Sequence, residues 1–268
     1  MQVICFEDAR KLSSKEIRKK IRLELYNNHT SGLAANKLQA NIVILPNEYA
    51  TDFINFCKLN PKACPLVGQT KLDNPYFETL GDNIDIRFDV PLYNIYENGN
   101  LISTVRNIED YWDNSFVAFA IGCSFSFEDA LLNAGLEIDH ITNNKVVPMY
   151  RTNIKNKKSG PFNSKMVVSM RIFNQKDINK VKQVSGNFSF AHGDPIHIGN
   201  PVEIGINNIL SPDWGDSPRK KNDDEEYIFW ACGVTPQNAI IEAKIPFCIT
   251  HTPGHMLITD ISENSLHC

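Results

Sequence analysis

Histidines beside a proline–glycine turn are the residues of this sequence best suited to proton transfer. The stretch THTPGHMLITD places His251 and His255 four residues apart. On a helix this spacing would present both rings to one zinc ion, but Pro253 and Gly254 exclude a helix here. We therefore expect His251 to end one strand and His255 to begin the next. Metal ligation, substrate binding or proton transfer, and a structural role all stay open for this pair.

A second pair of histidines lies in the segment HGDPIHIGNPVEIG. Glycine and proline prevent a regular helix around His192 and His197. If His197 lies on a short strand, its ring points away from the flanking isoleucines and can face a cleft. The alternative is that both rings bond to loop backbone. Asp216, in the following PDWGD, suits an acid, a substrate contact or a metal ligand, although turn formation is its default role.

Two strand–turn–helix junctions are the next candidates for a binding site. FAIGCSFSFEDALL and FWACGVTPQNAIIEA each join an apolar strand to a helix through a turn that contains glycine. Helix starts carry unpaired N–H groups that attract carboxylates. Gly122 and Gly233 would let the backbone approach a ligand, beside Ser124 and the expected helix cap Thr235. The two junctions are either a weak internal duplication or two independent ways of connecting a strand to a helix.

Charged and nucleophilic side chains lie near these junctions. Cys123 precedes a helix start, where a thiol pKa can be lowered, and Glu128 in the first turn is an acid or a partner of the helix dipole. Arg151 and Arg171 lie in apolar, strand-like segments, where a charge needs a partner or a ligand. Guanidinium groups bind carboxylates through two hydrogen bonds. A buried salt bridge is the alternative for each arginine.

Helices and strands must alternate to position these side chains. Ser13 and Glu16 form a capping box at the start of an amphipathic helix. ANIVILP predicts a buried strand that ends at Pro46, and NEYATDFINFCKLN predicts a second helix. The alternating arms around Asn98 and Gly99 predict a hairpin. This succession predicts an α/β fold.

The composition excludes several classes of protein. Hydrophobic residues make up 42% and charged residues 22% of 268 residues, which is typical of a globular chain. The net charge of −4 and scattered basic residues argue against nucleic-acid binding. The apolar runs are too short for a signal peptide or a membrane span. Seven widely spaced cysteines without a C-x-x-C motif favour reduced thiols and a cytoplasmic location.

Nine segments, in order along the chain, resemble one known family. They are TSGLAANKLQANIVILP, NPKACPLVG, FAIGCSFSFEDALL, VPMYRTN, MVVSMR, HGDPIHIG, PDWGD, FWACGVTPQ and THTPGHMLITD. Together they resemble the D-glutamate cyclase-like family, whose bacterial members are often called hydro-lyases, from about residue 31 to residue 260. Ile172, Asp194 and Trp214 stand where that family usually has proline, a small apolar residue and phenylalanine. Asp194 is expected to raise the pKa of His192 beside it.

The resemblance implies an α/β fold with two lobes, which we expect to hold mixed sheets flanked by helices. We place one discontinuous lobe at residues 1–85 with 186–268, and an inserted second lobe at residues 86–185. The resemblance also implies a carbon–oxygen lyase, a hydro-lyase acting on a small amino or carboxylic acid. Mitochondrial relatives convert D-glutamate to 5-oxo-D-proline and water. No catalytic residues are carried over from the family.

Cyclisation of glutamate needs an anchor, an oxyanion site and a proton carrier. Arg151 or Arg171 would anchor the α-carboxylate, and N–H groups of the two junctions would bind the γ-carboxyl group and its oxyanion. One of the four histidines named above would move the proton, because its pKa lies near neutrality. This chemistry requires no organic cofactor, and we expect neither a cofactor nor a bound metal.

Three other functions stay open. The first is a metal-assisted dehydratase of another hydroxy or amino acid, with histidines and Asp216 as ligands. The second is a non-catalytic carboxylate-binding protein, and the third is a hydrolase with Cys123 as its nucleophile. The expected partner is a small carboxylate, with no nucleic acid or membrane, and the sequence leaves a homo-oligomer open.

Overall fold

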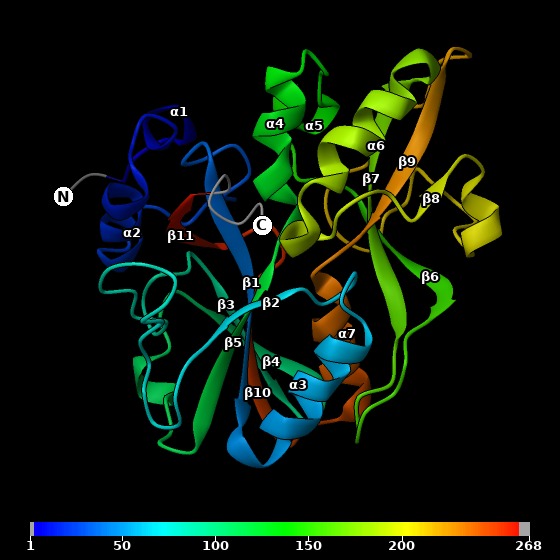
Figure 1. Cartoon of the computed structure of the whole chain (residues 1–268). Coiled ribbons are helices and arrows are strands. Elements are labelled where there is room, and N and C mark those ends of the chain that lie inside the picture. The colour runs from blue at the N-terminus through cyan, green and yellow to red at the C-terminus, as the bar shows by residue number, and fades with distance from the viewer. Residues whose placement is uncertain (1–2, 263–268) are drawn as a thin grey trace.

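Two β-sheets form the centre of the structure, a computed structural model that describes residues 3–262 (Figure 1). The larger sheet contains β1 (Lys37–Pro46), β2 (Leu66–Gln69), β3 (Tyr93–Glu97), β4 (Asn100–Val105), β5 (Phe116–Gly122), β10 (Phe247–His251) and β11 (Leu257–Ser262). Its order is β2-β5-β1-β10-β3-β4, and β11 also pairs with β1. The smaller sheet, in the order β6-β7-β9-β8, contains β6 (Met149–Lys155), β7 (Lys165–Asn174), β8 (His197–Ile198) and β9 (Glu225–Ala231).

Helices flank both sheets. They are α1 (Phe6–Ala9), α2 (Ser14–Arg22), α3 (Ala50–Leu59), α4 (Glu128–Asn133), α5 (Asp139–Thr142), α6 (Ile178–Gly186) and α7 (Val234–Ala243). The fold is therefore the predicted α/β class, with two sheets flanked by helices. Each pairing described within these two sheets is antiparallel. Within residues 3–262, no helix is both long and apolar enough to cross a membrane.

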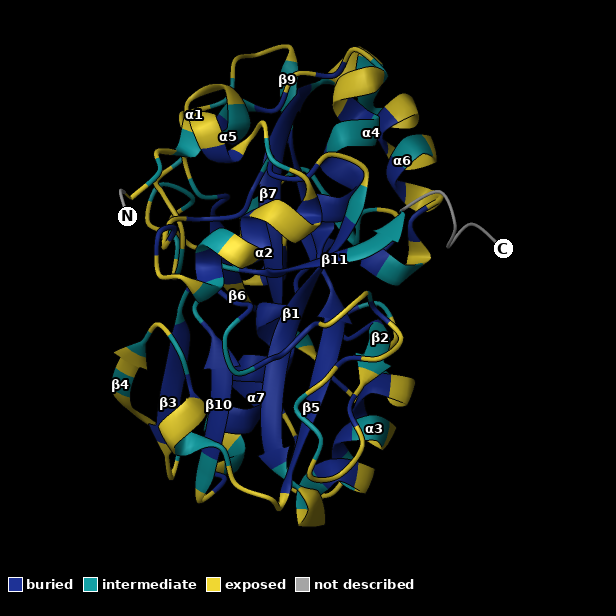
Figure 2. Cartoon of the chain, turned by 90° about the vertical axis from the view of Figure 1, so that its left-hand side faces the viewer, coloured by how far each residue is buried: buried dark blue, intermediate teal, exposed yellow. Residues whose placement is uncertain are grey.

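The central strand β1 is buried on both faces (Figure 2). Val43 and Leu45 point into a core shared with α3 and α7, whereas Ile42 and Ile44 point into a second core on the opposite face. Side chains alternate between the faces of a strand, so a continuous apolar run is what a doubly covered strand requires. The run ANIVILP therefore predicts this strand correctly.

The helices that follow β5 and β9 each pack in the core of the other sheet. After β5, the chain contributes Phe127 and Leu131 to a core with Trp230 of the smaller sheet. After β9, α7 contributes Ala239 and Ile240 to the core of the larger sheet. Figure 1 shows α4 to α6 beside β7 and β9, and α3 and α7 beside β1. This exchange brings the two junctions together between the sheets.

Local sequence signals predict their elements well. Ser13 and Glu16 form both hydrogen bonds of the capping box at the start of α2. Asn98 and Gly99, with φ angles of 49° and 79°, form the tight turn between β3 and β4. Gly135, with φ of 77°, follows α4 as the predicted stop. These signals depend on neighbours in sequence and not on tertiary contacts.

The strands of the two sheets come from different parts of the chain. The larger sheet uses segments within residues 37–122 and 247–262, and the smaller sheet uses segments within residues 149–231. The larger sheet is therefore discontinuous in sequence. The lobe boundaries at residues 85/86 and 185/186 stay a prediction.

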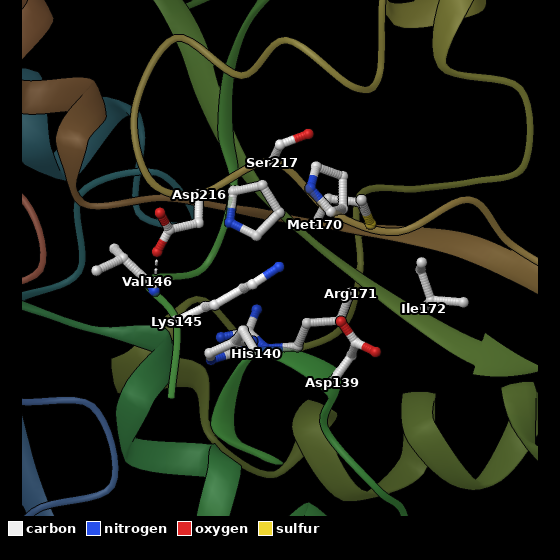
Figure 3. A pocket seen from close by; sticks show the side chains of 11 residues that line it. Asp139, His140, Lys145, Val146, Met170, Arg171, Ile172, Asp216 and Ser217 are labelled. Atoms are coloured by element: carbon white, nitrogen blue, oxygen red, sulfur yellow. Dashed lines mark hydrogen bonds between the residues drawn. The ribbon is translucent and has the colours of Figure 1, made fainter. Parts of the chain in front are cut away.

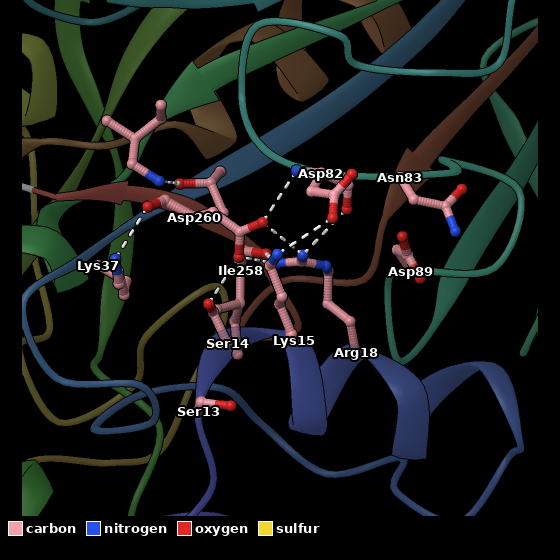
Figure 4. Close-up of polar contacts among 12 residues, drawn as sticks. Ser13, Ser14, Lys15, Arg18, Lys37, Asp82, Asn83, Asp89, Ile258 and Asp260 are labelled. Atoms are coloured by element: carbon pink, nitrogen blue, oxygen red, sulfur yellow. Dashed lines mark hydrogen bonds and ion pairs between the residues drawn. The ribbon is translucent and has the colours of Figure 1, made fainter.

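A buried ion pair ties α2 to the last described strand (Figure 4). Arg18, 3% exposed, donates from Nη1 and Nη2 to the Asp260 carboxylate at 2.9 and 2.8 Å. The Ser14 hydroxyl and the Asp82 N–H donate to the same carboxylate at 2.7 and 2.9 Å. Burial alone would raise the pKa of Asp260, but these donors outweigh it and lower that pKa.

Asp260→Asn is expected to destabilise the protein by roughly 2–3 kcal/mol at pH 7, because it removes one partner of a mostly buried pair. A lowered folded-state pKa stabilises the protein fully above the ordinary Asp pKa of about 4, and this stabilisation is lost progressively as the pH falls from there through the lowered pKa. Urea unfolding at pH 7 and pH 3 should therefore show a smaller acid loss in the variant than in the wild type. Asp110→Asn, at an exposed acid, is the control. Equal acid losses in Asp260→Asn and wild type would contradict the prediction.

Candidate functional site

The two strand–turn–helix junctions use the same hydrogen bonds. After β5, the Cys123 N–H donates to Gln39 O, and the serine hydroxyl three residues later accepts from the Gln39 N–H, both at 3.0 Å. After β9, the Cys232 N–H donates to Val167 O, and Thr235 Oγ1 accepts from the Val167 N–H, again at 3.0 Å. In each junction a side-chain hydroxyl accepts the backbone N–H hydrogen bond that a neighbouring strand would otherwise accept. The likeness seen in the sequence thus extends to the hydrogen bonds.

Thr235 does not cap its helix as predicted. Helix α7 begins at Val234, with Gly233 as the N-cap residue. The Thr235 hydroxyl also donates to Val167 O at 3.2 Å, and its N–H donates to Cys232 O at 2.9 Å. Both polar groups are therefore used within the fold, which places Thr235 in a structural role.

Gly122 and Gly233 are required by packing between the junctions. A Cβ at Gly122 would lie 1.7 Å from Phe190 O, and one at Gly233 would lie 1.9 Å from Asn41 Nδ2. Asn41 is buried, and its Nδ2 donates to Gly122 O at 3.2 Å. Protein atoms therefore fill the space that a side chain would occupy at both glycines, which accounts for glycine at these positions. The approach of a ligand to these glycines stays a prediction.

A buried ionic network forms where the first junction meets β7. Arg171 is 3% exposed and donates from Nε to Glu128 Oε1 at 3.2 Å. Its Nη2 donates to the Ser124 hydroxyl at 3.0 Å. The rings of Phe127 and Trp230 have centroids 5.1 and 5.3 Å from the guanidinium carbon, within the range of cation–π attraction. The fold thus joins three predicted site residues, Arg171, Glu128 and Ser124.

Glu128 is the shared anion of this network. It accepts a hydrogen bond from the Ser31 hydroxyl at 3.2 Å, and His140 Nε2 lies 2.9 Å from its Oε1. The His140 contact lacks hydrogen-bond geometry, so Nε2 has no hydrogen-bond partner among the described residues. Burial alone would raise the pKa of Glu128, but the charges of His140 and Arg171 outweigh it and lower that pKa to about 2. Glu128 is therefore an ionised counter-ion, and its predicted role as an acid is wrong.

Arg171 and His140 also line a small pocket (Figure 3). Its volume is about 20 Å³, which is room for about one water molecule or the head of a small polar group. The lining residues are Asp139, His140, Lys145, Val146, Pro148, Met170, Arg171, Ile172, Asp216, Ser217 and Pro218. Asp216 is a predicted site residue, and it fixes the pocket wall through its Oδ2, which accepts from the Val146 N–H at 2.8 Å.

The turn between His251 and His255 positions a loop that belongs to the network. Gly254 O accepts from the Thr30 N–H at 2.9 Å, and the Thr30 hydroxyl accepts from the Met256 N–H at 2.9 Å. These two hydrogen bonds fix the position of the loop, so that the hydroxyl of the next residue, Ser31, contacts the Glu128 carboxylate. His255 Nδ1 contacts Pro253 O at 3.1 Å, and burial lowers the pKa of His255. The turn therefore contributes to the site by holding Ser31.

His251 is a core histidine. It is fully buried on β10, and its Nδ1 accepts from the Ile42 N–H at 3.0 Å. Gln237 Nε2 lies 2.8 Å from the same nitrogen and donates to His251 O at 3.0 Å. Burial lowers the pKa of His251 to about 3, so the ring is neutral at pH 7. Removing this ring would disturb the sheet as well as any reaction.

His192 and His197 both bond to loop backbone, which is the structural alternative for this pair. His192 Nδ1 donates to Lys62 O at 2.8 Å, and burial lowers the pKa of His192 to about 4. The expected rise of that pKa is wrong, because burial of the ring outweighs the other influences on it. Asp194 pairs with Lys62 Nζ at 2.7 Å. His197 Nε2 donates to Asn200 O at 2.9 Å, and neither histidine lines the pocket.

Arg151 lies in a different groove from Arg171. Its side chain is 53% exposed and pairs with Asp213 at 2.6 Å, with the guanidinium carbon 4.4 Å from the centroid of the Trp214 ring. The groove that it lines lies along β6 and includes Lys155 and Lys165. The two predicted arginines therefore do not share one site.

Cys123 is an apolar core residue at the first junction. It is 6% exposed and packs with Cys232 and Met256. Burial raises the pKa of its thiol, although the Phe125 N–H and Arg171 lower it in part. The predicted lowering of this pKa is wrong, because desolvation outweighs the helix start.

Native protein is therefore expected to keep full activity during treatment with iodoacetamide at pH 7, since a buried thiol with a raised pKa reacts slowly. Mass spectrometry should show labelling at Cys5, which is exposed, before labelling at Cys123. Early modification of Cys123 together with loss of activity would support the cysteine-dependent alternative instead.

The described residues offer no ligand set for a metal. Within residues 3–262, no three His, Cys, Asp or Glu side chains gather closely enough to hold an ion. The histidines near the pocket, His29 and His140, make other contacts: His29 Nε2 lies 3.1 Å from Asn144 Oδ1, and His140 faces Glu128. Asp216 instead accepts a backbone N–H.

Four residues at this site carry no clear signal in the sequence. Ser31, His140, Lys145 and Asp139 lie in segments that read as ordinary polar loop or short helix. Only the contacts of Ser31 and His140 with Glu128 connect them to the network. The TSGLAANKLQANIVILP motif is the one local signal that marks the neighbourhood of Ser31.

Fold and site define an α/β protein with a buried Arg–Glu–His network beside a small pocket. The D-glutamate cyclase family matches residues 117–260 of this chain. Relatives named "Putative hydro-lyase" include one from Dinoroseobacter shibae, 50% identical over 93% of this chain and 83% of its own length. Others from Pelagibacter ubique and Burkholderia ambifaria are 49% and 47% identical, over 94% and 95% of this chain and 96% and 99% of theirs. The chain therefore belongs to the D-glutamate cyclase family.

One solved structure that resembles this chain does so only weakly. A nitrogen repressor-like protein from Methanococcus jannaschii is 12% identical, with a TM-score of 0.39 over 88% of this chain and 91% of its own. This value is too low to carry an argument about the site.

Proposed function

We propose that this protein is a hydro-lyase that acts on a small amino acid at the pocket lined by Arg171 and His140. The observation that carries this proposal is that one ionised carboxylate, Glu128, holds both side chains from behind. The cation and the imidazole thus lie side by side where a carboxyl group can enter. Family membership and the names of the relatives support the same class of reaction.

We further propose D-glutamate as the substrate and 5-oxo-D-proline plus water as the products. The amine attacks the γ-carboxyl carbon, a C–N bond forms, one C–O bond breaks, and the departing oxygen leaves as water. A carboxylate is a poor electrophile because it already carries negative charge. The site must therefore surround it with donors, accept two protons in succession from the ammonium group and deliver both to the oxygen that leaves as water.

The network supplies groups of the required kinds. Four of the five N–H donors of Arg171 bond to Glu128, Ser124 and Ser169. The remaining Nη1 N–H and the positive charge serve the γ-carboxyl group and the oxyanion that forms from it. His140 can carry the two protons in turn from the amine to the leaving oxygen, because a ring nitrogen can both accept and donate a proton. Glu128 balances the charge of Arg171 and of a protonated His140. Ser31 and Ser124 fix the carboxylate and the guanidinium from their outer sides.

The residues proposed for carboxylate binding and for proton transfer therefore differ from those expected from the sequence. In this proposal Arg171, and not Arg151, binds the carboxyl group, because only Arg171 lines the pocket. His140 takes the role considered for four other histidines from the sequence. Among those four, His251 and His192 are neutral and buried in packed regions.

Incubation with D-glutamate, L-glutamate and both 5-oxoproline enantiomers, analysed by chiral chromatography, tests the proposal. The expected result is 5-oxo-D-proline from D-glutamate alone, unaffected by a chelator. Conversion that stops with a chelator would indicate the metal-assisted dehydratase instead. Thermal stabilisation by glutamate without any product would indicate a carboxylate-binding protein.

A further inference from the structure

Lys145 is a cation at the pocket without an ionic partner. It is exposed and lines the pocket, and it forms no ion pair in the part of the chain that the structure describes. Figure 3 shows its side chain reaching across the pocket, with Asp216 above and His140 below it in this view. An unneutralised ammonium group in this place is available to an anionic ligand.

The backbone around Lys145 is held firmly. Its N–H donates to His140 O at 2.8 Å. The residue before it, Asn144, contacts His29 Nε2 through Oδ1 at 3.1 Å, and the residue after it, Val146, donates its N–H to Asp216. The base of the side chain therefore has a defined position relative to His140, while its charged end forms no ion pair with the residues that the structure describes.

The carboxylates of the pocket are occupied by other groups. Asp216 Oδ2 accepts from the Val146 N–H at 2.8 Å, and its N–H donates to Val146 O. Asp139 Oδ1 accepts from Arg219 Nε at 2.9 Å. Asp139 is thus paired with a cation, whereas Asp216 accepts a backbone N–H and has no ion pair among the described residues. Lys145 is the cation at the mouth that a carboxylate of the substrate would neutralise.

We infer that Lys145 selects a substrate with a second carboxylate, which it binds at the mouth while the reacting carboxyl group lies at Arg171 and His140. This inference rests on the proposed function and adds a specificity-determining residue to it. The enclosed volume of about 20 Å³ supports this arrangement, because it admits a head group and leaves the rest of the acid in the mouth. A charge-assisted contact of this kind is expected to change affinity by roughly 10- to 100-fold.

Binding of unreactive acids tests the inference without turnover. Glutarate carries two carboxylates and butyrate carries one, and affinities can be obtained from thermal shifts over a range of concentrations. Wild type should bind glutarate roughly 10- to 100-fold more tightly than butyrate, and Lys145→Met should abolish the difference. Lys158→Met, at an exposed lysine in the β6–β7 connection, is the matched control and should behave as wild type. Failure of wild type to prefer glutarate, or an unchanged preference in Lys145→Met, would overturn the inference.

Turnover separates this inference from the proposed reaction. Lys145→Met should raise KM for D-glutamate by roughly 10- to 100-fold with kcat within about threefold, since the contact serves binding. Loss of kcat with unchanged KM would overturn the specificity role. If wild type turns over no substrate yet prefers glutarate through Lys145, the hydro-lyase proposal fails and the inferred carboxylate contact stands.

Discussion

Arg171→Met is expected to lower kcat/KM by more than about 1,000-fold and to destabilise the protein by roughly 3–5 kcal/mol. The activity falls because the pocket loses the group that stabilises the oxyanion. The stability falls because Glu128, 1% exposed, keeps its charge without the guanidinium partner. Steady-state kinetics and urea unfolding at pH 7 measure the two effects separately.

The pH dependence of the Arg171→Met variant follows from the same pair. Loss of the guanidinium removes one of the charges that lower the pKa of Glu128, so the folded-state pKa of Glu128 is higher in the variant than in the wild type. A raised carboxyl pKa favours the folded state as the pH falls, so the loss of stability should shrink between pH 7 and pH 4. Arg171→Met/Glu128→Gln is the matched control: stability should largely return, whereas activity should not. Wild-type turnover in either variant would remove Arg171 from the mechanism.

His140→Asn is expected to lower kcat by roughly 100- to 10,000-fold, with KM changed by no more than about threefold. Asparagine keeps a polar side chain near Glu128 but cannot carry a proton near neutral pH. The fold should persist, because Arg171 still pairs with Glu128. Pre-steady-state and steady-state rates with D-glutamate measure the change, and circular dichroism checks the fold.

His197→Asn is the comparison variant for His140→Asn. His197 is partly buried on β8, bonds to Asn200 O and does not line the pocket, so its replacement should leave kcat within about threefold of wild type. Equal losses in the two variants would show that proton transfer does not depend on the pocket histidine. Such a result would return the role to a histidine predicted from the sequence.

Local signals in the sequence predict much of the fold. The capping box at Ser13, the turn at Asn98 and the stop at Gly135 each depend on residues a few positions apart. The apolar run of β1 depends on alternation along a single strand. These features are readable because their physical causes lie within one element.

Protonation states could not be read from the sequence in this way. The sequence offers Cys123 as a reactive thiol and His251 as a proton carrier, yet burial raises the first pKa and lowers the second. A pKa depends on desolvation and on charges from distant segments. Both are properties of the packed chain.

The sequence by itself determined the α/β class, the strand–turn–helix junctions and the family resemblance, because these follow from residue order and local periodicity. Only the tertiary structure decided which candidates meet. It joins Arg171 to Glu128 across 43 positions, brings His140 and Ser31 to the same carboxylate and sends Arg151 to another groove. The physical reason is that the helix after β5 packs in the core of the smaller sheet, and this crossing is set by long-range burial of apolar side chains.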